Sequence, residues 1–119
     1  MFSFEKLEVY NRSMDFYDLV HLFLKQKKSL PVYLKNQLGR AALSIPLNIA
    51  EGSAKFSNRD RKNYYATARG SVFECAAIFR IMRREEEVDS DFEGCAIQSL
   101  DEISRMLYSM IRKLEATSD

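Results

Sequence analysis

The chain of 119 residues has no tryptophan, one histidine, two cysteines, two prolines and four glycines. So little glycine and proline argues against a many-stranded β fold, whereas a few long helices with short connections need few turn residues. Two isolated cysteines exclude a disulfide framework and a thiolate metal cluster, and we expect Cys75 and Cys95 to be buried thiols. Because 46% of the residues are hydrophobic, one core can form, and we expect a single all-α domain over residues 1–119.

Long apolar segments are also missing. No stretch approaches the roughly 18 consecutive apolar residues that a membrane-spanning helix needs. Glu5, Lys6 and Glu8 interrupt the N-terminal region where a signal peptide would be continuously apolar. We therefore expect a cytoplasmic protein without a membrane partner.

Apolar residues recur every three or four positions in four segments, which predicts helices near 5–28, 31–52, 58–86 and 90–116. Short connections between them favour an up-down antiparallel four-helix bundle. Pro31 suits the first turn of the second helix, and Gly52 its end. Pro46 lies in the interior of that helix, where its ring and missing N–H predict a kink.

Helix starts have their own signals. Ser57 with Asp60, and Ser90 with Glu93, have the spacing of capping boxes, so we expect serine N-caps for the third and fourth helices. In the third helix we expect three small residues to let a neighbouring helix approach closely: Ala66, Gly70 and Ala77. Such close packing would compensate the stability that a glycine costs in a helix interior.

The core positions follow from the same periodicity. On the first helix we expect one stripe to fill the core, with a second apolar stripe beside it: Leu7, Tyr10, Met14, Tyr17, His21 and Leu24, then Val9, Phe16, Val20 and Phe23. Two stripes exceed what a lone bundle buries, which indicates self-association. The third and fourth helices each show one core stripe: Tyr65, Ala68, Val72, Cys75, Phe79 and Met82, then Phe92, Ala96, Leu100, Ile103, Leu107, Met110 and Leu114.

Catalytic machinery is not visible. The single histidine, His21, is expected to be packed and hydrogen-bonded rather than a metal ligand, and no phosphate-binding glycine loop or metal-binding histidine pair occurs. Glu51 and Glu74 lie among small and apolar neighbours, so we expect both to be partly buried in structural pairs. We expect no enzyme activity, no cofactor and no metal.

Charge is unevenly distributed although the formal net charge is +1. Residues 57–86 contain seven basic and four acidic residues, a surplus of +3, whereas residues 87–119 contain three basic and eight acidic residues, which gives −5. This uneven distribution of charge favours contacts between a basic and an acidic helix, within one chain or between subunits. Within the basic stretch, cations alternate with aromatic and amide residues, a mixture that can neutralise phosphates and stack bases: Lys55, Arg59, Arg61, Lys62 and Arg69. A solvated helix terminus is the other interpretation of these cations.

One segment carries a family resemblance. Residues 44–52 read S-I-P-L-N-I-A-E-G, which resembles the S-I-P-x-N-I-A-E-G signature of the bacterial four-helix bundle family linked to 23S ribosomal RNA intervening sequences. Residues 37–42 (Q-L-G-R-A-A) and 68–74 (A-R-G-S-V-F-E) extend the resemblance. The matching positions are first interpreted as determinants of the fold: Ser44, Pro46, Asn48, Glu51, Gly52, Gly70, Ser71 and Glu74. Among them, Asn48 and Ser71 are expected to satisfy backbone groups freed at Pro46.

The resemblance implies a homo-pentameric bundle without an established enzymatic role. It also implies a relation to the accessory proteins of diversity-generating retroelements, which are basic pentamers that bind nucleic acid and a reverse transcriptase. This chain is much less basic than that branch, and Gly39 stands beside Arg40 where the family often has a second cation.

Three hypotheses for function follow. The leading one is an oligomeric bundle that binds RNA or DNA through the basic stretch. The second is a scaffold for protein partners, in which the basic third helix and the acidic fourth helix dock across subunits. The third is an enzyme with a composite site at a subunit interface, involving Glu51 or Glu74.

Overall fold

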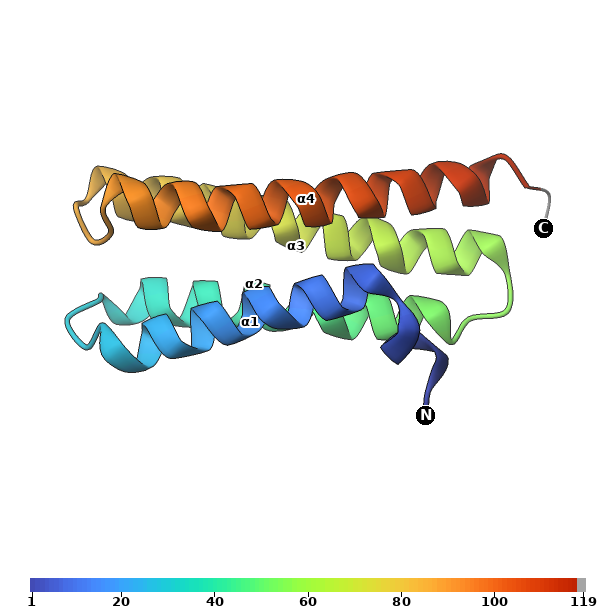
Figure 1. Ribbon diagram of the computed structural model, residues 1–119, viewed down its shortest axis with the longest axis horizontal. Helices are drawn as coiled ribbons and strands as arrows, with labels where there is room; N and C mark the ends of the chain where they lie inside the picture. The colour runs from blue at the N-terminus through green and yellow to red at the C-terminus, as the bar shows by residue number, and fades with distance from the viewer. Residues whose placement is uncertain (118–119) are drawn as a thin grey trace.

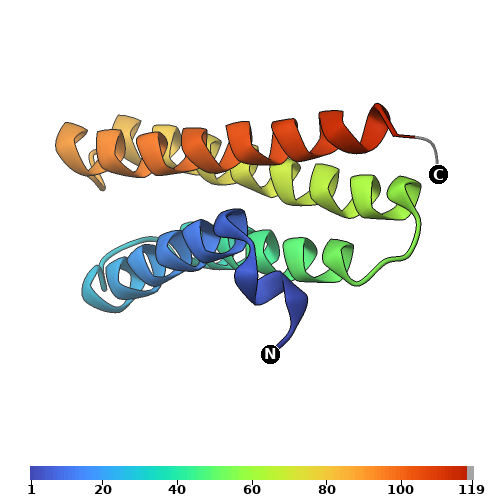
Figure 2. The ribbon, with the colours of Figure 1, turned by 45° about the vertical axis from the view of Figure 1, so that its right-hand side comes forward.

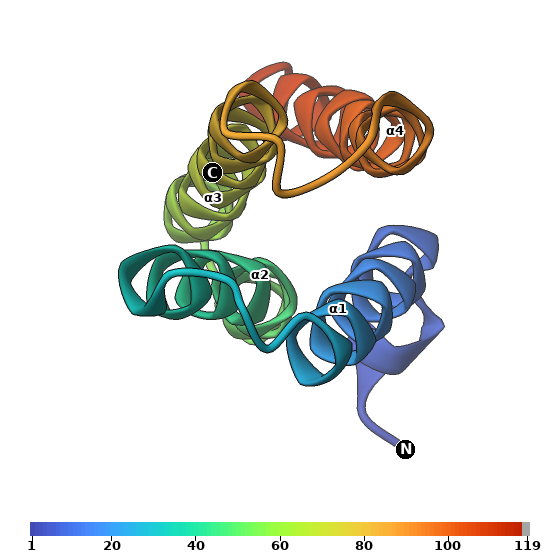
Figure 3. The same cartoon turned by 90° about the vertical axis from the view of Figure 1, so that its left-hand side faces the viewer.

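The structure is a computed structural model that describes residues 1–117. It contains a short 3-10 helix, η1 (Ser3–Lys6), and four α-helices: α1 (Glu8–Gln26), α2 (Val32–Ser53), α3 (Asn58–Arg84) and α4 (Ser90–Glu115). The described residues contain no strand. Helices consecutive in sequence run antiparallel and side by side, and α4 also contacts α1 (Figures 1 and 3). This arrangement confirms the predicted all-α up-down four-helix bundle.

The start of the chain differs from the single first helix that the sequence predicts. Leu7 has an extended backbone (φ −76°, ψ 126°), which separates η1 from α1. η1 then turns away from the axis of α1 and packs against both α1 and α2 (Figure 2). At the other end α1 stops at Gln26, slightly earlier than expected.

The second helix runs without interruption through its proline. Pro31 is the N-cap of α2, and the helix passes through the buried Pro46 and ends at Ser53, one residue beyond Gly52. The kink at Pro46 stays a prediction.

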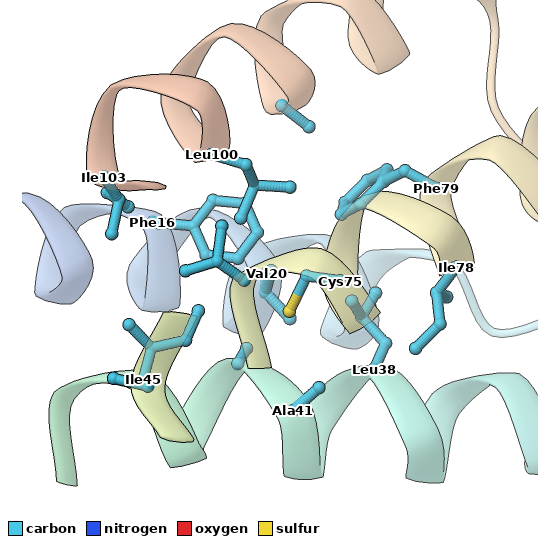
Figure 4. Close-up of a cluster of buried hydrophobic side chains, with 14 of the residues drawn as sticks. Phe16, Val20, Leu38, Ala41, Ile45, Cys75, Ile78, Phe79, Leu100 and Ile103 are labelled. Carbon is cyan, nitrogen blue, oxygen red and sulfur yellow. The ribbon is translucent and has the colours of Figure 1, made fainter. Parts of the chain in front are cut away.

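The core combines side chains from all four helices (Figure 4). The predicted stripes of α3 and α4 face it, and every α3 stripe residue is buried. On α1, however, the wrong stripe was assigned to the core. Val9, Phe16 and Val20 are buried, whereas the other stripe lies at the flank of the helix, only partly covered. Tyr10 packs on Phe4 of η1 with ring centroids 4.7 Å apart, so the chain itself covers part of this flanking stripe.

Two side-chain caps set where the later helices begin. Ser57 caps α3 as predicted, because its Oγ accepts a hydrogen bond from the Asp60 N–H at 3.0 Å. The cap of α4 is Asp89 and not Ser90, since the Asp89 carboxylate accepts from the Phe92 N–H at 2.8 Å. Asp89 has the extended backbone that a cap requires, and Ser90 is already the first helical residue.

Close helix approach occurs at a different glycine from the one predicted. Ala66, Gly70 and Ala77 are exposed, and a Cβ on Gly70 would meet nothing within 4 Å. A Cβ on Gly52 would instead lie 2.7 Å from Cε1 of Tyr65 and 3.0 Å from Cβ of Tyr64. The missing side chain of Gly52 is therefore what brings the end of α2 onto α3.

The two thiols lie in different environments. Cys75 is buried, and burial, with a smaller effect of the Glu74 charge, raises its pKa from 9.0 to about 12. Cys95 is exposed on α4, so the prediction that both thiols are buried is wrong for this residue. None of the helices within residues 1–117 is long and apolar enough to cross a membrane.

Candidate nucleic-acid interface

Four of the five predicted cations gather where α2 turns into α3. Lys55 lies in the turn, and Arg59, Arg61 and Lys62 occupy the first turns of α3. We call these four residues the basic end. The N-terminus and the last turns of α4 lie at the same end of the bundle (Figure 1).

The turn is held against α3 by the side chain of Arg61. Its Nε donates a hydrogen bond to the backbone carbonyl of Lys55 at 2.7 Å. The Lys55 ammonium lies 5.0 Å from the centroid of the Tyr64 ring, a cation–π distance. These contacts hold the turn and its cations in place at the start of α3.

Carboxylates lie beside two of the cations. Lys55 Nζ is 3.7 Å from Glu51, and Lys62 Nζ is 3.8 Å from Glu115 of α4. Both pairs are partly exposed to solvent, where an ion pair typically contributes about 0–1 kcal/mol. The charges of the basic end are therefore partly balanced by weak pairs that another anion could replace.

An aromatic side chain projects from the same turn. Phe56 is 99% exposed and directly follows Lys55. An apolar ring so fully in water contributes nothing to the core of this chain. Beside cations, such a ring is suited to stacking on an unpaired base.

Arg69 lies apart from the basic end. At 1.5 Å per residue it is about 12 Å along α3 from Arg61. Its guanidinium carbon lies 4.8 Å from the Phe73 ring centroid and 5.4 Å from that of Tyr108 on α4. Its Nε is buried and has no hydrogen-bond partner within residues 1–117. Arg69 thus belongs to an aromatic cluster between α3 and α4.

The charge asymmetry is matched within the chain by pairs between α3 and α4. Arg80 lies 3.1 Å from Glu93, and the Lys62–Glu115 pair links the same two helices. These pairs fit the expected match between a basic and an acidic helix. These charges are therefore paired within one chain, whereas the scaffold hypothesis uses them for contacts between subunits.

Three residues of the family signature form a hydrogen-bonded cluster between α2 and α3. Asn48 Nδ2 donates to the Ser44 carbonyl at 2.8 Å and to Ser44 Oγ at 2.9 Å, and Ser71 Oγ donates to Ser44 Oγ at 2.8 Å. The carbonyl that loses its helical partner at Pro46 is that of Ala42, four residues earlier. The expectation that Asn48 and Ser71 serve that freed group is therefore wrong. Ser71 instead joins α3 to Ser44 of α2, and Asn48 bonds Ser44 within α2.

Other predicted residues lie at the surface. Glu51 and Glu74 are exposed, so their expected burial is wrong. His21 is also exposed and stacks on Tyr17 with centroids 6.1 Å apart, and is not a core residue. Within the described part of the chain, no three His, Cys, Asp or Glu side chains come together as metal ligands would.

Lys113, near the end of α4, lines the same cavity as Arg61. It was not predicted for this interface. The antiparallel packing of α4 on α3 brings these two cations together, and their proximity cannot be predicted from the local sequence.

The comparisons with known proteins agree with this fold. No curated protein matches the chain. Among solved structures, the chain is similar to a protein of unknown function from the S23 ribosomal protein family of Bacteroides thetaiotaomicron. The TM-score is 0.80 at 24% identity, over 87% of this chain and 97% of the other. The family model described as 23S rRNA-intervening sequence protein matches residues 5–109, so the chain belongs to this family.

Proposed function

We propose that the chain is a non-enzymatic, cytoplasmic, homo-oligomeric bundle that binds RNA or DNA through its basic end. The observation that carries the proposal is the fully exposed Phe56 in the same turn as Lys55 and next to Arg59, Arg61 and Lys62. Cations that neutralise phosphates beside an aromatic ring that stacks on bases are the two components of single-strand binding surfaces.

The neighbouring carboxylates do not prevent phosphate binding. Glu51 and Glu115 form partly exposed pairs with Lys55 and Lys62, at 3.7 and 3.8 Å. Because each surface pair is weak, a phosphate can replace the carboxylate at little cost. Arg61 forms no ion pair within residues 1–117, and its Nε is bonded to the Lys55 carbonyl.

Assembly of several chains would place several copies of the basic end in one particle. Exposed apolar side chains on the outer faces of α2, α3 and α4 support an oligomer: Leu43, Leu47, Phe73, Ile81 and Tyr108. We take the pentamer implied by the family resemblance as the proposed state. Several basic ends on one strand can raise affinity by about a hundredfold or more without any new type of contact.

Salt dependence tests this proposal. Fluorescence anisotropy of a structured RNA and of a duplex DNA would be titrated at about 50 and 200 mM salt. Four phosphate contacts predict an affinity loss of about a hundredfold across this range. Absence of binding at both salt concentrations, by a protein shown to be folded, would contradict the proposal.

A protein scaffold is the second candidate function. The observation that favours it is the aromatic cluster around Arg69, where Phe73 is 56% and Tyr108 51% exposed beside the uncovered Gly70. The two candidates are separated by variants. Phe73→Gln with Tyr108→Gln should abolish partner binding if the chain is a scaffold, but would leave the phosphate contacts of each basic end in place if it binds nucleic acid.

A further inference from the structure

A recess opens at the basic end, between the N-terminal segment, the first turns of α3 and the last turns of α4. Its volume is about 520 Å³, inside the range of roughly 300–1,000 Å³ typical of small-ligand pockets. We call it the end pocket. Its lining includes Arg61 and Tyr65 of α3 together with Met110, Lys113 and Leu114 of α4.

The floor of the end pocket is apolar. Leu7, Met110 and Leu114 are partly buried side chains at the margin of the core, and Tyr65 is 5% exposed. Burial raises the pKa of the Tyr65 hydroxyl, and the nearby Arg61 guanidinium lowers it again in part, so the ring stays neutral at physiological pH. A flat aromatic ligand would find apolar contacts on this floor.

The rim of the end pocket is cationic. Arg61 and Lys113 line it, and none of its lining residues within 1–117 is acidic. The bond from its Nε to the Lys55 carbonyl holds the Arg61 guanidinium in place. The Lys113 ammonium takes part in no ion pair of the described residues. The N-terminus of α3, with its positive helix pole, adds to the attraction for an anion at this rim.

We propose that the end pocket holds one unstacked nucleotide of a single-stranded RNA or DNA, its base on the apolar floor and its phosphate between Arg61 and Lys113. This inference rests on the proposed function, because the same strand would continue over Lys55, Arg59 and Lys62 outside the pocket. A base within a duplex is paired and stacked, and must be extruded before it could enter. The end pocket therefore makes the protein prefer single strands.

The test compares two strand forms of one sequence. The full-length protein would be titrated with a fluorescent single-stranded RNA and with the corresponding blunt duplex. We expect the wild type to bind the single strand at least tenfold more tightly. Lys113→Glu should remove most of this preference for the single strand over the duplex. Lys25→Glu, the same charge change at the far end of α1, should preserve it.

A floor variant, Leu114→Gln, tests the apolar half of the site. This variant should also reduce the ratio of single-strand affinity to duplex affinity. Circular dichroism checks that it keeps its helicity. Should Leu114→Gln fail to fold, the exposed Lys113→Glu variant decides alone.

The possible failures are distinguishable. Binding with a strand ratio that Lys113→Glu leaves unchanged would overturn the end pocket and leave the basic end intact. No binding of either strand form would overturn both proposals. Saturation by free adenosine monophosphate, without any preference for single strands, would make the pocket a site for free nucleotides and overturn its role in strand binding.

Discussion

Gly52 shows how a single missing side chain determines a helix contact. Alanine normally stabilises a helix interior relative to glycine by up to about 1 kcal/mol. At Gly52, however, the added Cβ would stand 2.7 Å from the buried Tyr65 ring. We expect Gly52→Ala to lower the free energy of unfolding by about 1–3 kcal/mol, as overpacking does.

The matched control is Gly70→Ala, because a Cβ at Gly70 meets nothing within 4 Å. That variant should be as stable as the wild type or up to about 1 kcal/mol more stable. Urea unfolding of both variants measures the difference. Equal stabilisation by the two substitutions would show that Gly52 is not a packing constraint.

The two cysteines should differ in reactivity. At pH 8 the exposed Cys95 should react with a disulfide reagent, whereas the buried Cys75, with a pKa of about 12, should react only after unfolding. A thiol titration before and after denaturant therefore predicts one and then two reactive groups per chain. Two fast-reacting thiols in the folded protein would contradict the burial of Cys75.

The same thiol predicts a dependence of stability on pH. Its pKa is higher in the folded state than the ordinary 9.0, so folded Cys75 keeps its proton while the unfolded chain loses it. This contribution to stability is fully present below pH 9 and is lost as the pH rises towards 12. Cys75→Ala should flatten the decline in the free energy of unfolding over that interval, and an unchanged slope would refute the assignment.

At the scale of the helices, the start of α4 depends on one carboxylate. Because Asp89 accepts from the Phe92 N–H at 2.8 Å, Asp89→Ala should cost about 1 kcal/mol of stability. Ser90→Ala is the control, with an expected change of a few tenths of a kcal/mol. Thermal or urea unfolding distinguishes them, and a larger loss from Ser90→Ala would move the cap to the serine.

Periodicity was sufficient for the helices and for the core faces of α3 and α4, because each of these helices carries one continuous apolar stripe. It failed on α1, where two adjacent stripes are both apolar and the packing of α1 against α2 and α4 decides which one is buried. Asp89 and Ser90 are both good capping residues, so only the backbone geometry distinguishes them.

The candidate interface was predictable in part. The cluster of Lys55, Arg59, Arg61 and Lys62 follows from local sequence, because a turn and the first residues of one helix stay together. The separation of Arg69 follows from the rise of α3 itself, since eight residues span about 12 Å. The positions of Lys113 and Glu115 near the basic end depend on how α4 packs against α3, which no local pattern encodes. The exposure of Glu51 and Glu74 depends in the same way on the orientation of α2 and α3.

For the whole molecule, self-association is a prediction that follows from the exposed aromatic cluster of α3 and α4. The wild type should have a mass several times that of the 13.8 kDa chain by light scattering. Phe73→Gln with Tyr108→Gln should shift the mass towards one chain, because burial of large aromatic side chains dominates many interfaces. Leu22→Gln alters a residue of the same 56% exposure as Phe73 but on α1, and should leave the mass unchanged. A wild-type mass of one chain across micromolar concentrations would contradict the prediction.

The proposed site for nucleic acid is the end of the bundle where α2 meets α3. The most direct measurement is the RNA affinity and its salt slope for Arg59→Ala/Arg61→Ala/Lys62→Ala, compared with Lys25→Ala/Arg83→Ala/Arg84→Ala at the opposite end. Both variants remove two arginines and one lysine, at opposite ends of the bundle, and circular dichroism checks that the first, which also loses the Arg61 bond to the Lys55 carbonyl, stays folded. We predict that the first loses at least tenfold in affinity and about three units of salt slope, while the second keeps the wild-type slope. Equal effects of the two variants, or none, would contradict the claim.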